Sequence, residues 1–279
     1  MTAFRGKNFR SGDLVEQLGI LLLQNVSLVS PIPRTEDVGI DVVSTLVRDF
    51  DGYKYIAEDS FFIQIKSTSV KKIKFEKEEV KWLADLELPY FIASVDKKTS
   101  KIYLYCTHYL SDVLATNPNR EKITLEVAAS KNYDCTDSAK SIKVPTGPYI
   151  ISWTLETIEK DKDFIKKFYS LLKAHISISK KAIETRRIGI VDLIKWDNEL
   201  EPKVFGTKIN GKDQGKEFDN IAKPYLDGLL TKLSFGNDIH ITRSLYRLLE
   251  KILLKEGHLI IEDGEKKLIP YKYDLKKIK

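Results

Sequence analysis

The chain has 279 residues, of which 42% are hydrophobic and 31% charged, and its formal net charge is +6. This length suggests one large domain or two of ordinary size, and the composition is that of a soluble globular protein with a real core. No stretch approaches the roughly 18–20 apolar residues of a membrane-spanning helix, and the basic start lacks the apolar region of a secretion signal. We therefore expect a cytoplasmic protein with no membrane contact.

The cysteines indicate the redox compartment of the protein, and the distribution of charge indicates what it could bind. Cys106 and Cys135 supply neither a disulfide framework nor a paired metal motif, which fits a reducing cytoplasm. Residues 1–150 hold as many basic as acidic side chains, so the whole positive excess falls in residues 151–279. A basic surface suits a polyanion such as nucleic acid, although excess lysine is also a common solubility device.

The N-terminal part predicts a helix and then a break. Apolar residues recur at helical spacing over residues 13–24. Asp13 is a candidate N-cap, and Glu16, three residues later, completes a capping-box pattern. Pro31 and Pro33 then interrupt the chain before the first strand.

Two short apolar strands are predicted next, and they carry polar side chains that are uncommon in apolar strands. Asp41 lies among β-branched residues, where a lone carboxylate is disfavoured. Gln64 and Lys66 alternate with isoleucines, so both point to one face of their strand. The Asp-Gly pair at residues 51–52 predicts a turn between the two strands. If the strands pair, an acid, an amide oxygen and an ammonium gather on one sheet surface.

The next elements complete an α/β pattern. Residues 70–74 form a basic connection, and a helix is predicted from about Phe75 to Leu86. Strands are predicted at residues 90–95 and 101–106, and a further one near 123–127. This order of helix, strands, helix and strands places helices on a central mixed sheet.

A Pro-Thr-Gly-Pro segment marks the predicted domain boundary, with domains at residues 1–145 and 146–279. In the second domain, amphipathic helices are predicted at residues 164–176 and 243–254, and a small hairpin at 258–271. We expect this domain to be mostly helical and to position a substrate, form a dimer or bind a partner.

The polar residues of the two strands suit a metal site for phosphate chemistry. Hydrolysing a phosphodiester requires an activated water and a stabilised leaving group, and Mg²⁺ can provide both. Asp41 supplies one ligand, Gln64 an amide oxygen, and Ile65 a backbone carbonyl. Lys66 is then the catalytic ammonium, and Glu16 on the first helix completes or hydrogen-bonds the metal shell.

A glutamate on the first helix, then Gly39-Ile40-Asp41, then Gln64-Ile65-Lys66-Ser67, resembles the PD-(D/E)xK nuclease superfamily. The pattern is most similar to the glutamine (QxK) branch, as in Mrr-type restriction endonucleases and defence-associated nuclease domains. The resemblance covers roughly residues 5–130 and implies a restriction-endonuclease-like core. It implies that Asp41 is the metal-binding acid, that Gln64 replaces the usual second acid, and that Lys66 is the catalytic lysine. Glu16 matches the first-helix glutamate.

The resemblance further implies a Mg²⁺-dependent endonuclease, with Mn²⁺ as a possible substitute, that cuts double-stranded DNA in restriction or antiviral defence. Cutting both strands with one site per chain favours a homodimer or a subunit of a larger assembly. Lys71, Lys72 and Lys74 are expected at the mouth of the site, where phosphates approach.

Three other functions stay open. The chain is alternatively a degenerate nuclease-fold subunit of a larger defence complex, which binds DNA or a partner and in which Gln64 marks the loss of metal affinity. It is also a candidate for a structural or regulatory subunit whose helical half binds another protein. A junction-resolving enzyme would keep the chemistry and change the substrate.

Each site residue also has a structural interpretation. Gln64 and Lys66 suit the solvated face of an edge strand, since lysine protects sheet edges. Glu16 suits a cap alone, and the basic connection suits a solvated loop. Cys106 and His108 are expected to share a strand face, but no second pair of ligands stands at usable spacing, so we expect no metal site there.

Overall fold

The computed structural model describes residues 9–33, 39–51, 53–129, 133, 135, 137–187, 189–209, 259–262 and 265–268. The chain divides into two compact units, Met1–Asn210 and Gly211–Lys279. In the second unit the described residues form one antiparallel hairpin of β12 (Leu259–Glu262) and β13 (Glu265–Leu268), which confirms the hairpin predicted there. The predicted helix at 243–254 lies outside the described residues.

The first unit is built on a six-stranded mixed sheet with the strand order β1-β2-β3-β5-β6-β9. Its strands are β1 (Leu28–Pro31), β2 (Val42–Asp49), β3 (Tyr55–Ser67), β5 (Tyr90–Asp96), β6 (Lys101–Cys106) and β9 (Ile151–Trp153). The β3–β5 pair is parallel, and the other neighbours in this sheet are antiparallel. The predicted α/β class with a mixed central sheet is therefore confirmed. Because β3 pairs on both sides, the edge-strand interpretation of Gln64 and Lys66 is wrong.

The predicted turn between the first two site strands is present as the β2–β3 hairpin. The Asp51 Oδ1 atom accepts hydrogen bonds from the backbone N–H groups of Tyr53 and Lys54, at 3.0 and 2.8 Å. The Phe50 N–H donates to the Lys54 carbonyl at 2.9 Å. An aspartate that binds the backbone two and three residues on is a common way of closing a turn.

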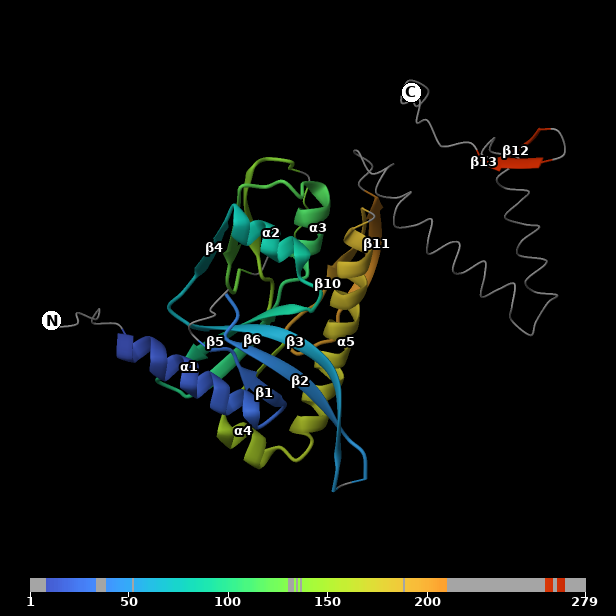
Figure 1. Cartoon of the computed structure of the whole chain (residues 1–279). Helices are drawn as coiled ribbons and strands as arrows, with labels where there is room; N and C mark the ends of the chain where they lie inside the picture. The colour runs from blue at the N-terminus through green and yellow to red at the C-terminus, as the bar shows by residue number, and fades with distance from the viewer. Residues whose placement is uncertain are drawn as a thin grey trace. The chain divides into compact units, whose positions relative to one another are not determined.

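Two long helices pack on the sheet. In Figure 1, α1 (Phe9–Gln24) lies across the strands, and α5 (Phe164–Arg186) runs beside them. α1 contacts β1, β3 and β5, while α5 contacts β2 and β3. Since α1 begins at Phe9, Asp13 lies inside the helix, and its predicted N-cap role, with the capping box of Glu16, is wrong.

A second, three-stranded sheet lies outside the central one. It consists of β4 (Lys72–Glu76), β7 (Lys122–Glu126) and β8 (Ser141–Pro145) in the order β4-β7-β8. Here the basic connection predicted at residues 70–74 is wrong, because Ile73 and Phe75 alternate with exposed residues and pair with β7. The helix predicted from about Phe75 to Leu86 is confirmed with a later start. The helix of this region, α2 (Glu78–Asp85), begins only after β4 has ended.

The first unit extends well past the predicted boundary at residue 145. The further elements are α3 (Tyr109–Thr116), α4 (Leu155–Lys160), β10 (Ile190–Lys195) and β11 (Lys203–Ile209). β9 completes the central sheet, and the buried Trp153 donates its indole N–H to the Leu22 carbonyl at 3.1 Å. Trp153 also packs edge-on against Phe168 of α5. This shared core includes β9 and α5 in the first unit, which ends at Asn210.

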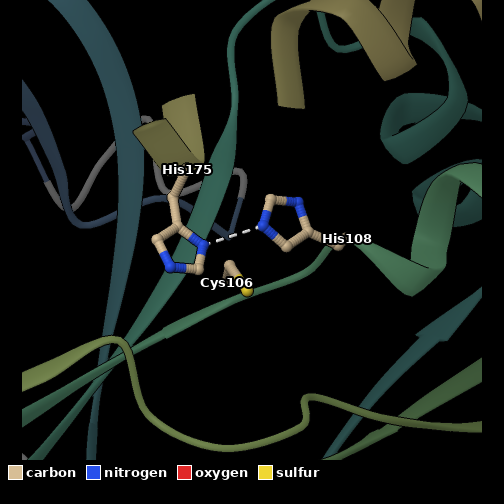
Figure 2. Close-up of side chains that lie close together, drawn as sticks. All are labelled: Cys106, His108 and His175. Carbon is tan, nitrogen blue, oxygen red and sulfur yellow. Dashed lines mark hydrogen bonds between the residues drawn. The ribbon is translucent and has the colours of Figure 1, made fainter. Parts of the chain in front are cut away.

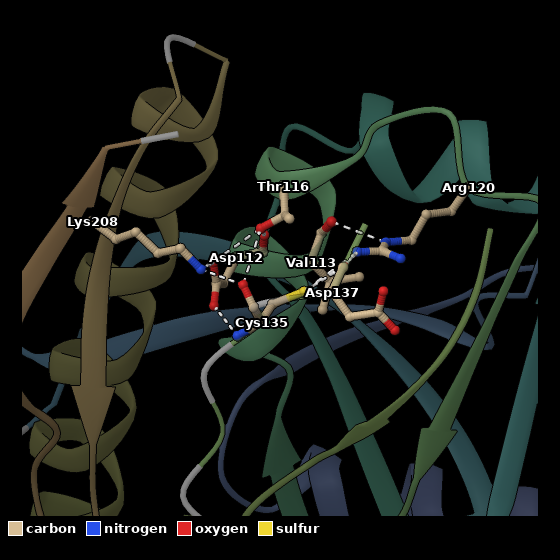
Figure 3. A network of polar contacts seen from close by, with 7 residues as sticks. All are labelled: Asp112, Val113, Thr116, Arg120, Cys135, Asp137 and Lys208. Carbon is tan, nitrogen blue, oxygen red and sulfur yellow. Dashed lines mark hydrogen bonds and ion pairs between the residues drawn. The ribbon is translucent and has the colours of Figure 1, made fainter. Parts of the chain in front are cut away.

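A polar network fixes the segment before β8 to α3 and β11 (Figure 3). The buried Asp112 carboxylate accepts from the Cys135 N–H at 2.7 Å and pairs with Lys208 at 3.2 Å. The buried Arg120 guanidinium donates to the Val113 carbonyl at 3.2 Å and also reaches the carbonyls of Asp137 and Ala139. Together these contacts satisfy buried charges that would otherwise destabilise the unit.

Charged side chains also join β3 to α5. Lys173 pairs with Glu58 at 2.7 Å and with Asp59 at 2.8 Å, and Tyr169 donates to Glu58 at 2.9 Å. Lys180 pairs with Asp59 as well. Within the described ranges, no helix is long and apolar enough to cross a membrane.

Candidate active site

The Asp41 carboxylate lies against the backbone of the Gln64–Lys66 segment. Asp41 immediately precedes β2, where its N–H donates to the Ile63 carbonyl at 3.0 Å and its carbonyl accepts from Ile32 at 2.9 Å. Its Oδ2 atom accepts from the Ile65 N–H at 2.5 Å. The prediction that two paired strands bring this carboxylate to the Gln64–Lys66 segment therefore agrees with the geometry.

The strand register explains this placement. Val42 pairs with Ile63, so Asp41, one residue earlier, comes level with Gln64. In an extended strand the N–H and C=O of one residue face the same neighbour. The carbonyl of Ile65 therefore faces the Asp41 side of β3 together with its N–H.

Gln64 is buried and already has a hydrogen-bond partner. Gln64 is only 6% exposed, and its Oε1 atom accepts a hydrogen bond from the Tyr90 hydroxyl at 2.8 Å. The same hydroxyl lies 3.3 Å from the Gly39 carbonyl. An amide oxygen has two lone pairs, so the Tyr90 contact leaves capacity for one further donor or cation. Tyr90 is thus a site residue that the sequence pattern did not reveal.

Lys66 follows on the same face of β3 as Gln64, because side chains alternate along a strand. Its side chain is half-buried, and its ammonium forms no ion pair or hydrogen bond with any side chain or carbonyl that the structure describes. This distinguishes it from Lys173 and Lys180, whose ammonium groups are held by carboxylates. An ammonium on the same face as Gln64, close to the strand that follows Asp41, is suited to offset developing negative charge.

Glu16 approaches the sheet from a different direction. A Cβ atom on Gly19 would lie 2.7 Å from the Cγ2 atom of Ile65, so α1 packs on the face to which Ile65 points. Gln64 and Lys66 point to the opposite face. The structure therefore does not place half-buried Glu16 on the face of Gln64 and Lys66.

The three predicted DNA-binding lysines lie on or beside β4 and are exposed. Lys72 and Lys74 share the outward face of that strand, and Lys71 directly precedes it. Lys72 forms an ion pair with Glu126, with an Nζ to Oε1 distance of 3.6 Å. The basic segment is thus a strand face and not the loop that the sequence predicted.

A second group of reactive side chains lies at the end of β6, where the sequence predicted none. Cys106 ends β6, His108 precedes α3, and His175 comes from α5 (Figure 2). The expectation that Cys106 and His108 share a strand face is wrong, because the strand ends at Cys106. One ligand atom from each of the three lies within 4.8 Å of the others. Sequence spacing gave Cys106 and His108 no further ligand, but α5 brings His175, which is distant in sequence, next to both.

Burial sets the protonation of this group. Desolvation lowers the pKa of His175 to about 4 and lowers that of His108 well below its usual value. It also raises the pKa of the Cys106 thiol. All three side chains are therefore uncharged at neutral pH. A signal existed in the sequence, since His175 falls on the same helical face as Phe168, Leu171 and Leu172, which pack into the core.

No protein-family model matches this chain, and no curated protein or solved structure matches it. The fold and the site define a class only, which is a mixed α/β protein whose central sheet carries an aspartate against a strand with a glutamine and a lysine.

Proposed function

We propose that the first unit is a Mg²⁺-dependent endonuclease that hydrolyses phosphodiester bonds of double-stranded DNA in the cytoplasm, in restriction or antiviral defence. The observation that carries this proposal is the Asp41 carboxylate, bound at 2.5 Å to the N–H of the residue between Gln64 and Lys66. A restriction-endonuclease-like core is part of the proposal, and the parallel β3–β5 pair next to the antiparallel β2–β3 hairpin supports it.

The residues present fit a magnesium ion by their chemistry. Mg²⁺ prefers oxygen ligands, and Asp41, Gln64 and Ile65 each offer an oxygen at this edge of β3. When bound, the ion would activate water and stabilise the leaving oxygen. The hydrogen bond from Tyr90 occupies one lone pair of Gln64, so this residue is the weakest of the three donors. Mn²⁺ has the same preference and would serve as a substitute.

The protein's own side chains supply the remaining chemistry. Lys66 orients the attacking water and offsets the charge that accumulates on the phosphate. Asp41 is held in one orientation by the Ile65 N–H, so it does not lose rotamer freedom when substrate binds. Exposed Lys71, Lys72 and Lys74 contact DNA phosphates. Because the part of the chain that the structure describes holds one such site, cleavage of both strands calls for a homodimer or a larger assembly.

Plasmid cleavage by matched variants tests this proposal. We expect the parent chain to cut supercoiled plasmid with Mg²⁺ or Mn²⁺ and to be inactive with a chelator. Asp41→Asn and Lys66→Ala should each lose on the order of a hundredfold or more in rate. The control Lys54→Ala, in the β2–β3 turn, should cut like the parent. If either site variant also cuts like the parent, the assignment is wrong.

The choice of asparagine at position 41 follows from the structure. Asp41→Ala leaves the Ile65 N–H without its acceptor, which costs on the order of 1–3 kcal/mol. Asparagine keeps an oxygen for that hydrogen bond while it removes the negative charge. A loss of cleavage in Asp41→Asn, with an unchanged unfolding midpoint, therefore reports on chemistry and not on stability.

The hydrogen bond between Tyr90 and Gln64 also favours a second candidate, a degenerate nuclease-fold subunit that binds DNA or a partner without cutting. A buried glutamine that holds a tyrosine has a structural role even without a metal. In that case the protein would shift plasmid in a gel without cleaving it. Phosphate contacts predict an affinity that falls steeply with salt, whereas a subunit that binds only protein would bind bare DNA weakly and with little salt dependence.

A further inference from the structure

Cys106, His108 and His175 converge from three separate elements on one buried point (Figure 2). The His108 Nε2 and His175 Nδ1 atoms are 2.9 Å apart, and the two rings are stacked with 13° between their planes. Each of the three residues is no more than 5% exposed. Trp196 packs against both histidines in T-shaped contacts, with its ring centroid 5.1 Å from that of His108.

The outward nitrogens of both imidazoles have partners of their own. The His175 Nε2 atom lies 3.3 Å from the Leu200 carbonyl, and the His108 Nδ1 atom lies 3.1 Å from the Ser179 hydroxyl. A carbonyl oxygen can only accept, so His175 carries its proton on Nε2 and presents a lone pair on Nδ1 toward His108. A metal-binding histidine characteristically donates its other N–H to a carbonyl or hydroxyl in this way.

We propose that Cys106, His108 and His175 form a binding site for one borderline-soft divalent transition-metal ion, with Zn²⁺ as the best match. Thiolate sulfur and imidazole nitrogen are both ligands that Zn²⁺ binds well and Mg²⁺ binds poorly. The protein supplies three ligands, and a water molecule takes the fourth position. This inference rests on residues other than Asp41, Gln64 and Lys66, so it is independent of the proposed nuclease function.

Ion binding changes the protons of the group in a balanced way. Without an ion, His108 donates from Nε2 to His175, and the Ser179 hydroxyl donates to His108 Nδ1. When the ion binds, the His108 proton moves to Nδ1, and the Ser179 oxygen becomes its acceptor. The Cys106 thiol gives its proton to solvent and forms the metal–sulfur bond, so one proton is released for each ion bound.

The geometry requires only local adjustment. Metal–nitrogen and metal–sulfur bonds of about 2.0–2.3 Å place tetrahedral ligands roughly 3.3–3.8 Å apart. The two nitrogens must therefore separate slightly, and the most distant ligand pair must approach by about 1 Å. A cleft that Thr107, Ser111, Ser179 and Arg186 line together with His108 lies next to the cluster.

Metal titration of the purified full chain tests the site. The protein is stripped with a chelator and then titrated with Zn²⁺ alone, and the bound metal is measured by elemental analysis after gel filtration. We expect one Zn²⁺ per chain, and with Co²⁺ a thiolate-to-metal charge-transfer band. If the parent retains no ion at stoichiometric Zn²⁺, the proposal is overturned, and the group is a metal-free hydrogen-bond chain from Ser179 to Leu200.

Matched cysteine variants locate the ion. Cys106→Ala removes a ligand and should weaken Zn²⁺ binding about a hundredfold and abolish the Co²⁺ charge-transfer band. Cys135→Ala removes the other buried cysteine, which is not in the cluster, and should bind like the parent. Circular dichroism shows whether each variant is folded. If a variant does not fold, the Zn²⁺ titration of the parent chain alone decides whether the site exists. Retention of the parent affinity and band by Cys106→Ala would refute the site.

Discussion

The Tyr90 hydroxyl donates a hydrogen bond to the Gln64 side-chain oxygen at 2.8 Å, across the parallel pair of strands β3 and β5. This contact fixes the orientation of an amide that the sequence assigns to a metal. It also provides a donor that would serve a carboxylate equally well, because a tyrosine hydroxyl can bind either group.

Replacement of Gln64 by glutamate therefore tests whether this position is a metal ligand. Gln64→Glu keeps the shape and the Tyr90 hydrogen bond and adds one negative charge. We expect the Mg²⁺ concentration for half-maximal cleavage to fall about tenfold or more, because a carboxylate attracts the cation more strongly than an amide. The matched control Gln17→Glu changes an exposed glutamine of α1 and should leave the metal dependence unchanged. An unchanged metal dependence in Gln64→Glu would remove residue 64 from the ligand set.

The packing of α1 on the sheet predicts opposite effects for two glycines of one helix. A Cβ atom at Gly19 would meet the Ile65 Cγ2 atom at 2.7 Å, so Gly19→Ala should destabilise the protein by about 1–3 kcal/mol through overpacking. A Cβ atom at Gly12 has no neighbour within 4 Å among the described residues, so Gly12→Ala should stabilise the helix by about 1 kcal/mol. Urea unfolding of both variants measures these changes. Equal effects would contradict the close contact between α1 and β3.

Acid should weaken the attachment of α5 to β3. Hydrogen bonds from Lys173, Arg48 and Tyr169 lower the pKa of Glu58 from 4.5 to about 2. Because the folded-state pKa lies below the unfolded one, the stabilisation is complete above pH 4.5 and is lost as the pH falls toward 2. We expect the melting temperature to fall across this interval, and Glu58→Gln should reduce the fall. Glu78→Gln, in an exposed pair with Lys81, serves as the control and should not alter the fall.

Two neighbouring arginines at the end of α5 should differ sharply in importance. The buried Arg186 guanidinium donates to the carbonyls of Leu83, Ala84 and Leu86, at 3.3, 2.6 and 3.2 Å, and so closes the C-terminal end of α2. Arg186→Met leaves these carbonyls without donors and should cost about 2–4 kcal/mol.

The matched change Arg187→Met breaks an exposed pair with Glu87 at 3.9 Å and should cost less than about 0.5 kcal/mol. Thermal unfolding of both variants gives the comparison. A similar loss in the two would mean that Arg186 does not close α2.

The sequence by itself determined the local elements of the central sheet. Alternating apolar residues identified β3, a continuous apolar run identified β5, and the Asp-Gly pair predicted the β2–β3 turn, because these features depend on neighbours within a few residues. The proximity of Asp41 to the Gln64–Lys66 segment followed from the same hairpin. These predictions succeeded because the spacing of apolar side chains and the turn-forming residues favour a single local structure.

Only the tertiary structure decided which distant segments share a core. Trp153 joins β9 to α1 and α5, so the unit continues to Asn210 although a Pro-rich turn interrupts the chain near residue 145. His175 reaches Cys106 and His108 through the packing of a long helix, which no local spacing encodes. The partner of Gln64 was equally hidden, because Tyr90 comes beside it only through the parallel pairing of β3 with β5. Such contacts depend on the packing of segments that are far apart in the chain, so no short stretch of sequence predicts them.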